Sequence, residues 1–386
     1  MRKSDIESLL APILPAGTRI TGVVHLSELW AGYGHIYRIH VEHPSSSSSP
    51  TTADKTYIVK TIRPPRQKGG YDEGHARKML SYQVEANFYR HYADKVASED
   101  CCVPNLFASS ITEEDTGAGQ VGQTLVLEDL SIRFPVLTER RGTLNDAQVT
   151  KSLEWLAHFH ASSWNIESSS TTHFCPPPSL AIDSAWNGSG LWQQGGYHYL
   201  ATRQSELSSI DPHTDTWGQL GLHSASDLPL SVDWCLNNPA DRSRLSLIHG
   251  DVKAANMAFS RDTSKMAMYD FQYVGIGLGV QDLVKFLTTS IPSRYLNNDD
   301  GELQLLRMYH SFSAAKLPKG ARYEFEDLVK DWELALVSWV RFLAGWSGGF
   351  WGNVDWLQDR VEALLRDPEW VEGLRDRWKT STQTQR

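Results

Sequence analysis

Two short apolar runs in the second half of the chain each end in an aspartate. Leu247–Gly250 leads into Asp251, Met266–Tyr269 leads into Asp270, and Asn256 follows five residues after the first acid. One carboxylate could accept the proton of an attacking hydroxyl, while the amide and the second carboxylate hold Mg²⁺ on nucleotide phosphates. Mg²⁺ prefers such hard oxygen ligands. The pattern therefore predicts phosphoryl transfer, which depends on positioning and charge neutralisation more than on covalent chemistry.

A lysine and a glutamate upstream complete this set. Lys60 ends the run Thr56–Val59, and Glu85 lies on the helical stretch that follows. A lysine at the end of such a strand can pair with the α- and β-phosphates of a nucleotide if a carboxylate holds it in place. The order strand, lysine, helix, glutamate thus predicts a phosphate-binding ion pair. The alternative is an ordinary surface pair, which would contribute only about 0–1 kcal/mol.

Two further features fit the same prediction. The segment Trp30–His35 contains Gly32 and Gly34, which would let backbone N–H groups approach phosphates, although an ordinary β-turn would look the same. Lys253, two residues after Asp251, could neutralise the transferring γ-phosphate or could be a solvated loop lysine.

A different interpretation makes Asp251 and Asp270 the paired carboxylates of a hydrolase. It leaves the upstream lysine and glutamate unexplained, so we favour phosphoryl transfer. His249 could be a general base, but we expect it to pack and hydrogen-bond so that it holds its loop. His160 lies on an apolar helical face, which is typical of a core histidine.

The elements that would position these residues fall into two groups. The first part of the chain has short β-branched or aromatic runs and one helical stretch, in which Leu80, Val84 and Phe88 recur every four residues. After about Leu130 the pattern is mostly helical. The expected strands are Arg19–His25, Ile36–Val41, Thr56–Ile62, Asn105–Ile111 and Gln123–Leu127, and the expected helices include Ala76–Tyr92 and Asp146–Trp164.

This division predicts an α+β fold of two lobes. We expect a small β-rich lobe over residues 1–128 and a larger, mostly helical lobe over residues 129–380, with a ligand-binding cleft between them. The Ser/Thr/Pro stretch 44–54 and the tail 379–386 are expected to be disordered.

The composition excludes several classes of function. The chain has 386 residues, is 40% hydrophobic and 22% charged, and carries a formal net charge of −9. An acidic chain without a dominant basic run is a poor nucleic-acid binder. Its four cysteines form no metal-ligand or disulfide pattern, and no apolar run suits a signal peptide or a membrane span. We therefore expect a cytoplasmic protein with no nucleic acid, no membrane and no evident protein partner.

Taken together, the motifs resemble the aminoglycoside phosphotransferase and choline kinase group of small-molecule kinases, and most closely its ecdysteroid kinase-like branch. Six stretches carry the resemblance, occur in the family order and span most of residues 20–290. They are Tyr57–Lys60, Ser81–Tyr89, Leu125–Leu130, Leu156–Ala161, Ile248–Asn256 and Asp270–Leu287. The resemblance implies a protein-kinase-like bilobal fold, with a small β-rich N-lobe and a larger helical C-lobe. It also implies an enzyme that transfers phosphate from ATP, with Mg²⁺, to a hydroxyl of a small molecule.

The resemblance also implies a role for each motif residue. Asp251 matches the catalytic base, and Asn256 and Asp270 match the Mg²⁺ ligands. Lys60 and Glu85 match the phosphate-binding ion pair.

Four other acidic or apolar residues match supporting positions of the family. Glu128, Asp129 and Leu130 match the hinge, whose backbone would bond the adenine, and Asp282 matches an acid that supports the catalytic loop from below. The triplet at 270–272 is Asp-Phe-Gln instead of the Asp-Phe-Gly of protein kinases, and no Ala-Pro-Glu segment follows. Both departures argue against a protein kinase, which remains an alternative together with an inactive nucleotide-binding scaffold.

The sequence does not identify the acceptor. Two aromatic, glycine-rich stretches, Gly190–Tyr199 and Gly345–Gly352, could form a partly apolar pocket with the late tryptophans. For any single tryptophan, core packing between helices is the favoured explanation. Sterols, amino alcohols, sugars and aminoglycoside-like acceptors all stay open.

Overall fold

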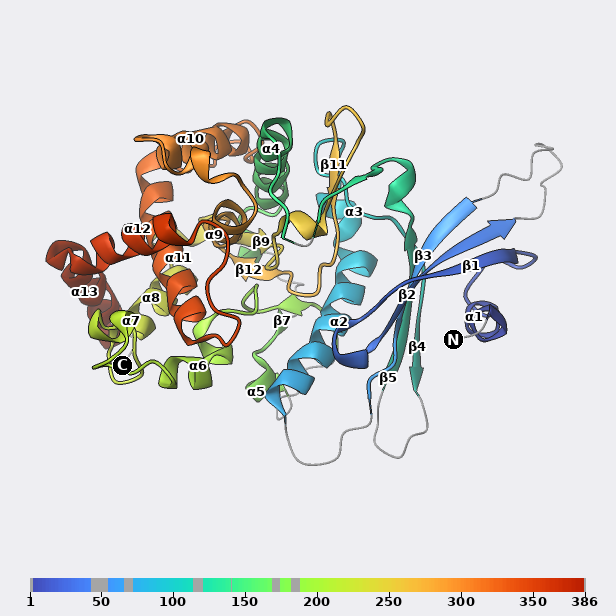
Figure 1. Ribbon diagram of the computed structural model, residues 1–386, viewed down its shortest axis with the longest axis horizontal. Helices are drawn as coiled ribbons and strands as arrows, with labels where there is room; N and C mark the ends of the chain where they lie inside the picture. The colour runs from blue at the N-terminus through green and yellow to red at the C-terminus, as the bar shows by residue number, and fades with distance from the viewer. Residues whose placement is uncertain are drawn as a thin grey trace.

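The computed structural model describes residues 3–42, 55–65, 72–113, 121–139, 141–168, 174–181 and 188–384. The chain forms a β-sheet lobe at its N-terminal end and a mostly helical lobe beyond it (Figure 1). The two-lobed α+β architecture expected from the sequence is confirmed. The stretch 44–54, expected to be disordered, lies outside the described residues.

One antiparallel sheet forms the N-lobe, with the strand order β1-β2-β3-β5-β4. Its strands are β1 (Arg19–Glu28), β2 (Gly34–Glu42), β3 (Lys55–Ile62), β4 (Leu106–Glu113) and β5 (Val121–Glu128). Each strand expected from β-branched and aromatic residues is present. In the register of the neighbouring strands β3 and β5, Lys60 lies opposite Leu125.

Side chains alternate along β3 between the two faces of the sheet. Val59 packs with Ile6 of α1 (Lys3–Leu10) on one face. Lys60 points to the other face, where it meets α2 (Glu73–His91). The alternation of one strand therefore decides which residue reaches the space between the lobes.

Helix α2 lies between the sheet and the helical lobe (Figure 1). The side chain of Asp72 caps its first turn by accepting a backbone hydrogen bond. Val84 and Phe88 are fully buried, and Phe88 stacks on Phe271 of the helical lobe with 4.0 Å between ring centroids. The helix expected over Ala76–Tyr92 is thus present and is held from both sides.

Helices build the larger lobe around buried aromatic side chains, including Trp332 and Trp339. The helix expected over Asp146–Trp164 begins with a capping box between Asn145 and Gln148. The longer helices are α4 (Asp146–Ser162), α8 (Leu228–Asn237), α9 (Val280–Thr289), α10 (Gly301–Ala314), α11 (Phe325–Gly345), α12 (Val354–Arg366) and α13 (Pro368–Thr384). Shorter helices are α3 (Ala93–Val96), α5 (Pro178–Ala181), α6 (Gln204–Ser208) and α7 (Thr216–Gln219).

Two small sheets, ordered β11-β10-β6 and β7-β8-β12-β9, carry the two aspartates. Strand β9 leads into the loop of Asp251, and β11 leads directly to Asp270. The short strands are β6 (Val136–Leu137), β7 (Phe174–Cys175), β8 (Leu191–Trp192), β9 (Ser246–Ile248), β10 (Met257–Phe259), β11 (Met266–Met268) and β12 (Gly275–Gly277).

The C-terminal segment departs from expectation. We expected residues 379–386 to be disordered, but α13 continues to Thr384. Pro368 starts this helix at a position where proline is well tolerated, and Arg375 anchors it to Asp227 at 2.8 Å. The prediction thus differs from the structure over residues 379–384, where the helix continues from turns held by tertiary contacts, and residues 385–386 lie outside the described residues. No helix of the described residues is long and apolar enough to cross a membrane.

Candidate active site

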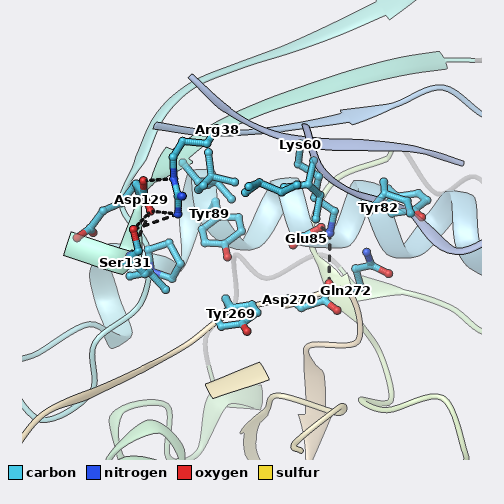
Figure 2. A pocket seen from close by; sticks show the side chains of 18 of the residues that line it. Arg38, Lys60, Tyr82, Glu85, Tyr89, Asp129, Ser131, Tyr269, Asp270 and Gln272 are labelled. Carbon is cyan, nitrogen blue, oxygen red and sulfur yellow. Dashed lines mark hydrogen bonds and ion pairs between the residues drawn. The ribbon is translucent and has the colours of Figure 1, made fainter. Parts of the chain in front are cut away.

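Lys60 joins the two lobes through two carboxylates (Figure 2). Its Nζ lies 2.6 Å from Oε2 of Glu85 and 3.2 Å from Oδ1 of Asp270. The side chains of Lys60 and Glu85 are only 7% and 2% exposed, so this is no surface pair. Burial alone would lower the pKa of Lys60, but the two carboxylates outweigh it and raise that pKa. The expected ion pair is present, with its ammonium charged.

The spacing of residues on α2 explains how this helix contributes to the site. Tyr82, Glu85 and Tyr89 recur at intervals of three and four residues, so they share one helical face. All three line the same cavity as Lys60. Nζ of Lys60 lies 5.5 Å from the ring centroid of Tyr82, which is a cation–π distance.

Asp270 is held in an uncommon backbone conformation. Its φ is 69°, a left-handed value that few non-glycine residues adopt. The next residue, Phe271, is fully buried, so the turn is anchored on both sides and directs the carboxylate toward Lys60. The described chain then runs within a few residues into β12 and α9, which leaves no room there for the activation segment of a protein kinase.

Asp282 of α9 holds the loop that carries Asp251. Its carboxylate accepts hydrogen bonds from the backbone N–H groups of His249 (2.6 Å) and Gly250 (2.8 Å). Gly250 has a φ of 79°, and a Cβ there would lie 2.3 Å from the carbonyl oxygen of Tyr273. These contacts agree with the supporting role expected of Asp282.

The two histidines near this loop, His249 and His160, make hydrogen bonds that hold neighbouring segments together. Nε2 of His249 lies 3.0 Å from the carbonyl oxygen of Tyr269, and burial lowers the pKa of His249. His160 bridges Asp282 and Tyr309 at 3.1 Å and 2.8 Å. Both imidazoles are engaged in contacts that hold the loop or the core, which agrees with the expectation that neither is the general base.

Both oxygens of the Asp251 carboxylate have cationic partners. Oδ2 lies 2.7 Å from Nζ of Lys253 and 3.2 Å from Nδ2 of Asn256, and Oδ1 contacts Nζ of Lys285. Burial works to raise the pKa of Asp251, but Lys285 and Lys253 outweigh it and hold that pKa well below its usual range. The carboxylate is therefore ionised, as a proton acceptor must be. Sequence reasoning missed Lys285; its only signal was its place three residues after Asp282 on one face of α9.

Asn256 and Asp270 offer oxygen ligands that suit a divalent cation. Nδ2 of Asn256 donates to the backbone oxygen of Asp251 at 2.9 Å, which turns its Oδ1 the other way. The backbone oxygen of Asn256 accepts from the N–H of Tyr269 at 3.1 Å, and this bond brings Asn256 beside Asp270. The Asp270 side chain is 34% exposed and lines the cavity. One amide and one carboxylate oxygen, completed by water and phosphate, fit Mg²⁺.

Lys60, Glu85 and Asp270 border a cavity of about 410 Å³ between the lobes, whereas Asp251, Lys253 and Asn256 are not in its lining. The hinge segment Leu127–Ser131 lines it, including the predicted residues Glu128 and Leu130, together with apolar side chains such as Ile36 and Ile58 of the sheet. Figure 2 shows the charged and aromatic side chains that converge on it. The cavity thus has an apolar end at the hinge and a charged end at Lys60.

The turn between β1 and β2 is only partly as predicted. Its residues Glu28–Trp30 line the cavity, whereas Gly32 and Gly34 are not in the lining. Gly34 is required by a close approach, because a Cβ there would lie 1.8 Å from the carbonyl oxygen of Thr61 in β3. The structure therefore explains Gly34 by sheet geometry, and contact of either glycine with phosphate stays a prediction.

An ion pair that the sequence did not reveal ties the hinge to the sheet. Nε of Arg38 on β2 lies 2.6 Å from Oδ2 of Asp129, and its Nη2 lies 3.1 Å from Oγ of Ser131 (Figure 2). Burial would raise the pKa of Asp129, but hydrogen bonds from Arg38 and Ser131 outweigh it and lower that pKa. No fixed spacing links a strand residue to the hinge, so only the fold shows this contact.

The two aromatic, glycine-rich stretches come together near Asp251. Nζ of Lys285 lies 4.5 Å from the ring centroid of Tyr197 and 5.9 Å from that of Trp339. Trp339 lies against Trp351 of the second stretch, with 5.6 Å between ring centroids. An aromatic wall therefore extends from the base into the helical lobe.

Other late tryptophans serve the packing of helices. Nε1 of Trp332 donates to Glu302 at 2.6 Å, and Nε1 of Trp370 donates to Glu333 at 3.0 Å. The tryptophans thus divide between the helical core and the wall beside Asp251.

The sequence matches the model of the Ecdysteroid kinase-like family over residues 32–180 and 226–318, which is more than half of the chain. The chain belongs to this family. The matched ranges of this ecdysteroid kinase-like protein contain Lys60, Glu85, the hinge and both aspartate loops. Family membership and the two-lobed fold together support the conclusion that this protein is an enzyme of the small-molecule kinase kind.

Several solved structures resemble this chain over most of its length. An amicoumacin kinase in complex with AMP-PNP, Ca²⁺ and Ami is 10% identical, with 94% of each chain covered and a TM-score of 0.48. A choline kinase from Cryptosporidium parvum Iowa II is 11% identical, with 97% of this chain and 98% of that chain covered and a TM-score of 0.44. A Plasmodium vivax ethanolamine kinase is 11% identical, with 90% and 82% covered and a TM-score of 0.43. No curated protein matches the sequence.

Proposed function

We propose that this ecdysteroid kinase-like protein transfers the γ-phosphoryl group of ATP, with Mg²⁺, to a hydroxyl group of a small molecule. The observation that carries the proposal is the contact of Lys60 with both Glu85 and Asp270 at the wall of the interlobe cavity. It brings a fixed ammonium and a carboxylate for a metal ion to one point, beside an apolar cleft at the hinge. Such a combination suits a nucleoside triphosphate, with its base at the apolar end.

Each charged residue has a distinct part in the proposed transfer. Lys60 binds the α- and β-phosphates, while Asn256 and Asp270 hold Mg²⁺, which neutralises charge on the phosphates. Asp251 takes the proton of the acceptor hydroxyl as the hydroxyl oxygen bonds to the γ-phosphorus. The bond from that phosphorus to the β,γ-bridging oxygen breaks, and ADP leaves. Lys253 turns from Asp251 to the γ-phosphate, which its partly exposed side chain allows.

The proposed base-binding end lies at the hinge. Glu128 and Leu130 line the cavity, and the family resemblance implies that backbone groups of this hinge bond the adenine. The Arg38–Asp129 pair holds the hinge at a set distance from β2. It therefore keeps the width of the slot into which a flat purine ring fits.

The acceptor is proposed to bind on the helical-lobe side of Asp251. Nε1 of Trp339 and Nδ1 of His198 are buried and have no hydrogen-bond partner in the described part of the chain. Their rings lie 5.1 Å apart between centroids. Trp339 is fully buried and His198 is 4% exposed, so a ligand reaches these atoms only when neighbouring side chains move aside. Because buried polar atoms normally have partners, a hydroxylated ligand with an apolar face would then satisfy them. Sterols, sugars and amino alcohols all have this mixed character.

Thermal unfolding with and without Mg·ATP tests the nucleotide site. A ligand that binds only the native state at about 100 times its Kd stabilises by about 2.7 kcal/mol, which raises the melting temperature by several degrees. The shift should require Mg²⁺. No shift at saturating Mg·ATP would contradict the proposal.

A library of hydroxylated small molecules, added with Mg·AMP-PNP, then identifies the acceptor by a further shift. Each hit is assayed with ATP for ADP formation and, by mass spectrometry, for the phosphorylated product. Asp251→Ala should keep the nucleotide shift and abolish transfer, whereas Asp262→Ala, an exposed acid of the β10–β11 turn, should leave both unchanged. A nucleotide shift without turnover on any acceptor would instead favour an inactive scaffold.

A further inference from the structure

Lys285 is a buried cation attached to the proposed base. Its side chain is 3% exposed, its Nζ contacts Oδ1 of Asp251, and it donates to the hydroxyl of Tyr197 at 2.8 Å. A buried ammonium is costly unless it is paired, and Asp251 is the carboxylate that pairs with it here. The pair therefore constrains both side chains.

Helix α9 holds the catalytic loop at two levels. Asp282 binds the backbone N–H groups of His249 and Gly250, and Lys285, one turn later on the same face, binds the side chain of Asp251. A single rigid helix thus sets both the path of the loop and the direction of its carboxylate.

The two lysines at Asp251 differ in their freedom. Lys253 binds Oδ2 from the loop itself and is 36% exposed, so it can move to another anion. Lys285 binds Oδ1 from a helix and is enclosed by the rings of Tyr197 and Trp339. When Lys253 leaves, Lys285 still holds Oδ1 and Asn256 still donates to Oδ2 at 3.2 Å, so Oδ2 loses one of its two partners and can accept from the acceptor hydroxyl.

We propose that Lys285 is the positioning residue of the base: it fixes Oδ1 of Asp251, so that Oδ2 faces the acceptor hydroxyl once Lys253 has turned to the γ-phosphate. The inference rests on the proposed function and goes beyond it, because it assigns separate tasks to the two lysines. Lys285 does not line the interlobe cavity, so we expect its replacement to leave nucleotide binding unchanged.

The test compares Lys285→Met with the wild type in the full-length protein. Nucleotide affinity is measured by calorimetry with Mg·AMP-PNP, and turnover is measured as ADP formation from Mg·ATP, with the acceptor found in the library and with water. We expect turnover to fall about 100-fold, as when a catalytic group is misplaced by about 1 Å, while the nucleotide Kd stays within about twofold. Lys316→Met, which removes an exposed lysine paired with Asp100, should change neither quantity.

Two further variants separate positioning from mere structure. Lys285→Arg, which keeps the charge, should recover part of the lost turnover. In an Asp251→Asn background, Lys285→Met should cause no further loss, because the two residues act as one unit. If Lys285→Met does not fold, Lys285→Gln, which keeps a donor of similar length, takes its place.

Three results would overturn the inference: unchanged turnover in the methionine or glutamine variant, an equal loss of nucleotide affinity, or an additive loss in the Asp251→Asn background. A wild-type protein that neither binds Mg·AMP-PNP nor turns over would instead refute the proposed function, so the two failures are distinguishable.

Discussion

Replacing Lys60 by methionine would break the central ion pair while keeping most of the side-chain volume. Glu85, whose side chain is 2% exposed, would then be buried without its cation. Removing one partner of a buried pair costs about 3–5 kcal/mol. Glu85 can escape this cost only by taking a proton, which at pH 7 requires about 3.7 kcal/mol from an ordinary pKa of about 4.3. Both limits predict a loss of about 3–4 kcal/mol in the free energy of unfolding.

Urea denaturation of the wild type, Lys60→Met, Glu85→Gln and the double variant measures this coupling. The double variant removes both charges, so it should recover about 2–3 kcal/mol of the loss that the lysine change causes alone. The pH dependence has a definite sign. Burial already raises the folded-state pKa of Glu85 to about 7 against the opposing effect of Lys60, and removing Lys60 should raise that pKa further. The stability of Lys60→Met is therefore full below about pH 4 and falls as pH rises through the folded-state pKa. The variant should therefore lose less stability at pH 5 than at pH 7.

Additive losses in the two single variants would refute the reasoning, because they would mean that the two charges do not depend on each other. A loss for Lys60→Met that is equal at pH 5 and pH 7 would also refute it, since the cost would then not be that of an unpaired carboxylate. Lys316→Met controls for the loss of an exposed lysine and should change stability by less than about 0.5 kcal/mol.

Three other variants test the surroundings of the site. Gly250→Ala places a Cβ 2.3 Å from the carbonyl oxygen of Tyr273 at a φ of 79°, so the free energy of unfolding should fall by about 2 kcal/mol or more. The melting temperature and turnover should fall together, and an unchanged melting temperature would contradict the strain argument. Asp282→Asn replaces one of the two oxygens that accept from the catalytic loop by a donor, so turnover should fall about 100-fold. The Kd for Mg·AMP-PNP, measured by calorimetry, should change by less than about twofold, and wild-type turnover in this variant would contradict the supporting role of Asp282. Arg38→Met leaves Asp129 buried without its cation, so the free energy of unfolding in urea should fall by about 1–3 kcal/mol and Mg·AMP-PNP should bind more weakly. Unchanged nucleotide affinity would show that the hinge width does not depend on this pair.

Much of the candidate site was readable from the sequence because its parts lie at the ends of short, regular elements. Lys60 ends a strand, and Asp251 and Asp270 follow apolar runs that the structure confirms as β9 and β11. Glu85 lies on a helix that the recurrence of Leu80, Val84 and Phe88 predicted, although α2 is buried on more than one face. Residue type and local spacing are enough to predict a site residue when its strand or helix presents one functional side chain at a known end or face.

Other parts of the site depend on contacts between segments far apart in the chain. Arg38 meets Asp129 across 91 residues, and Lys285 meets Asp251 across 34. Neither contact follows a local period, and neither lysine nor arginine is distinctive on its own. The helical turns up to Thr384 were likewise not predicted from the polar composition of this segment.

The sequence by itself determined the two-lobed α+β plan, the chemistry of phosphoryl transfer and the residue types that would carry it. These follow from local periodicity and from the few side chains that can hold a metal ion, bind phosphate or accept a proton. Only the tertiary structure decided that Lys60 contacts Glu85 and Asp270 at once, and that both oxygens of Asp251 are occupied by lysines. The physical reason is that ion pairs and carboxylate directions are set by distances of a few ångströms between separate elements, which no spacing along the chain specifies.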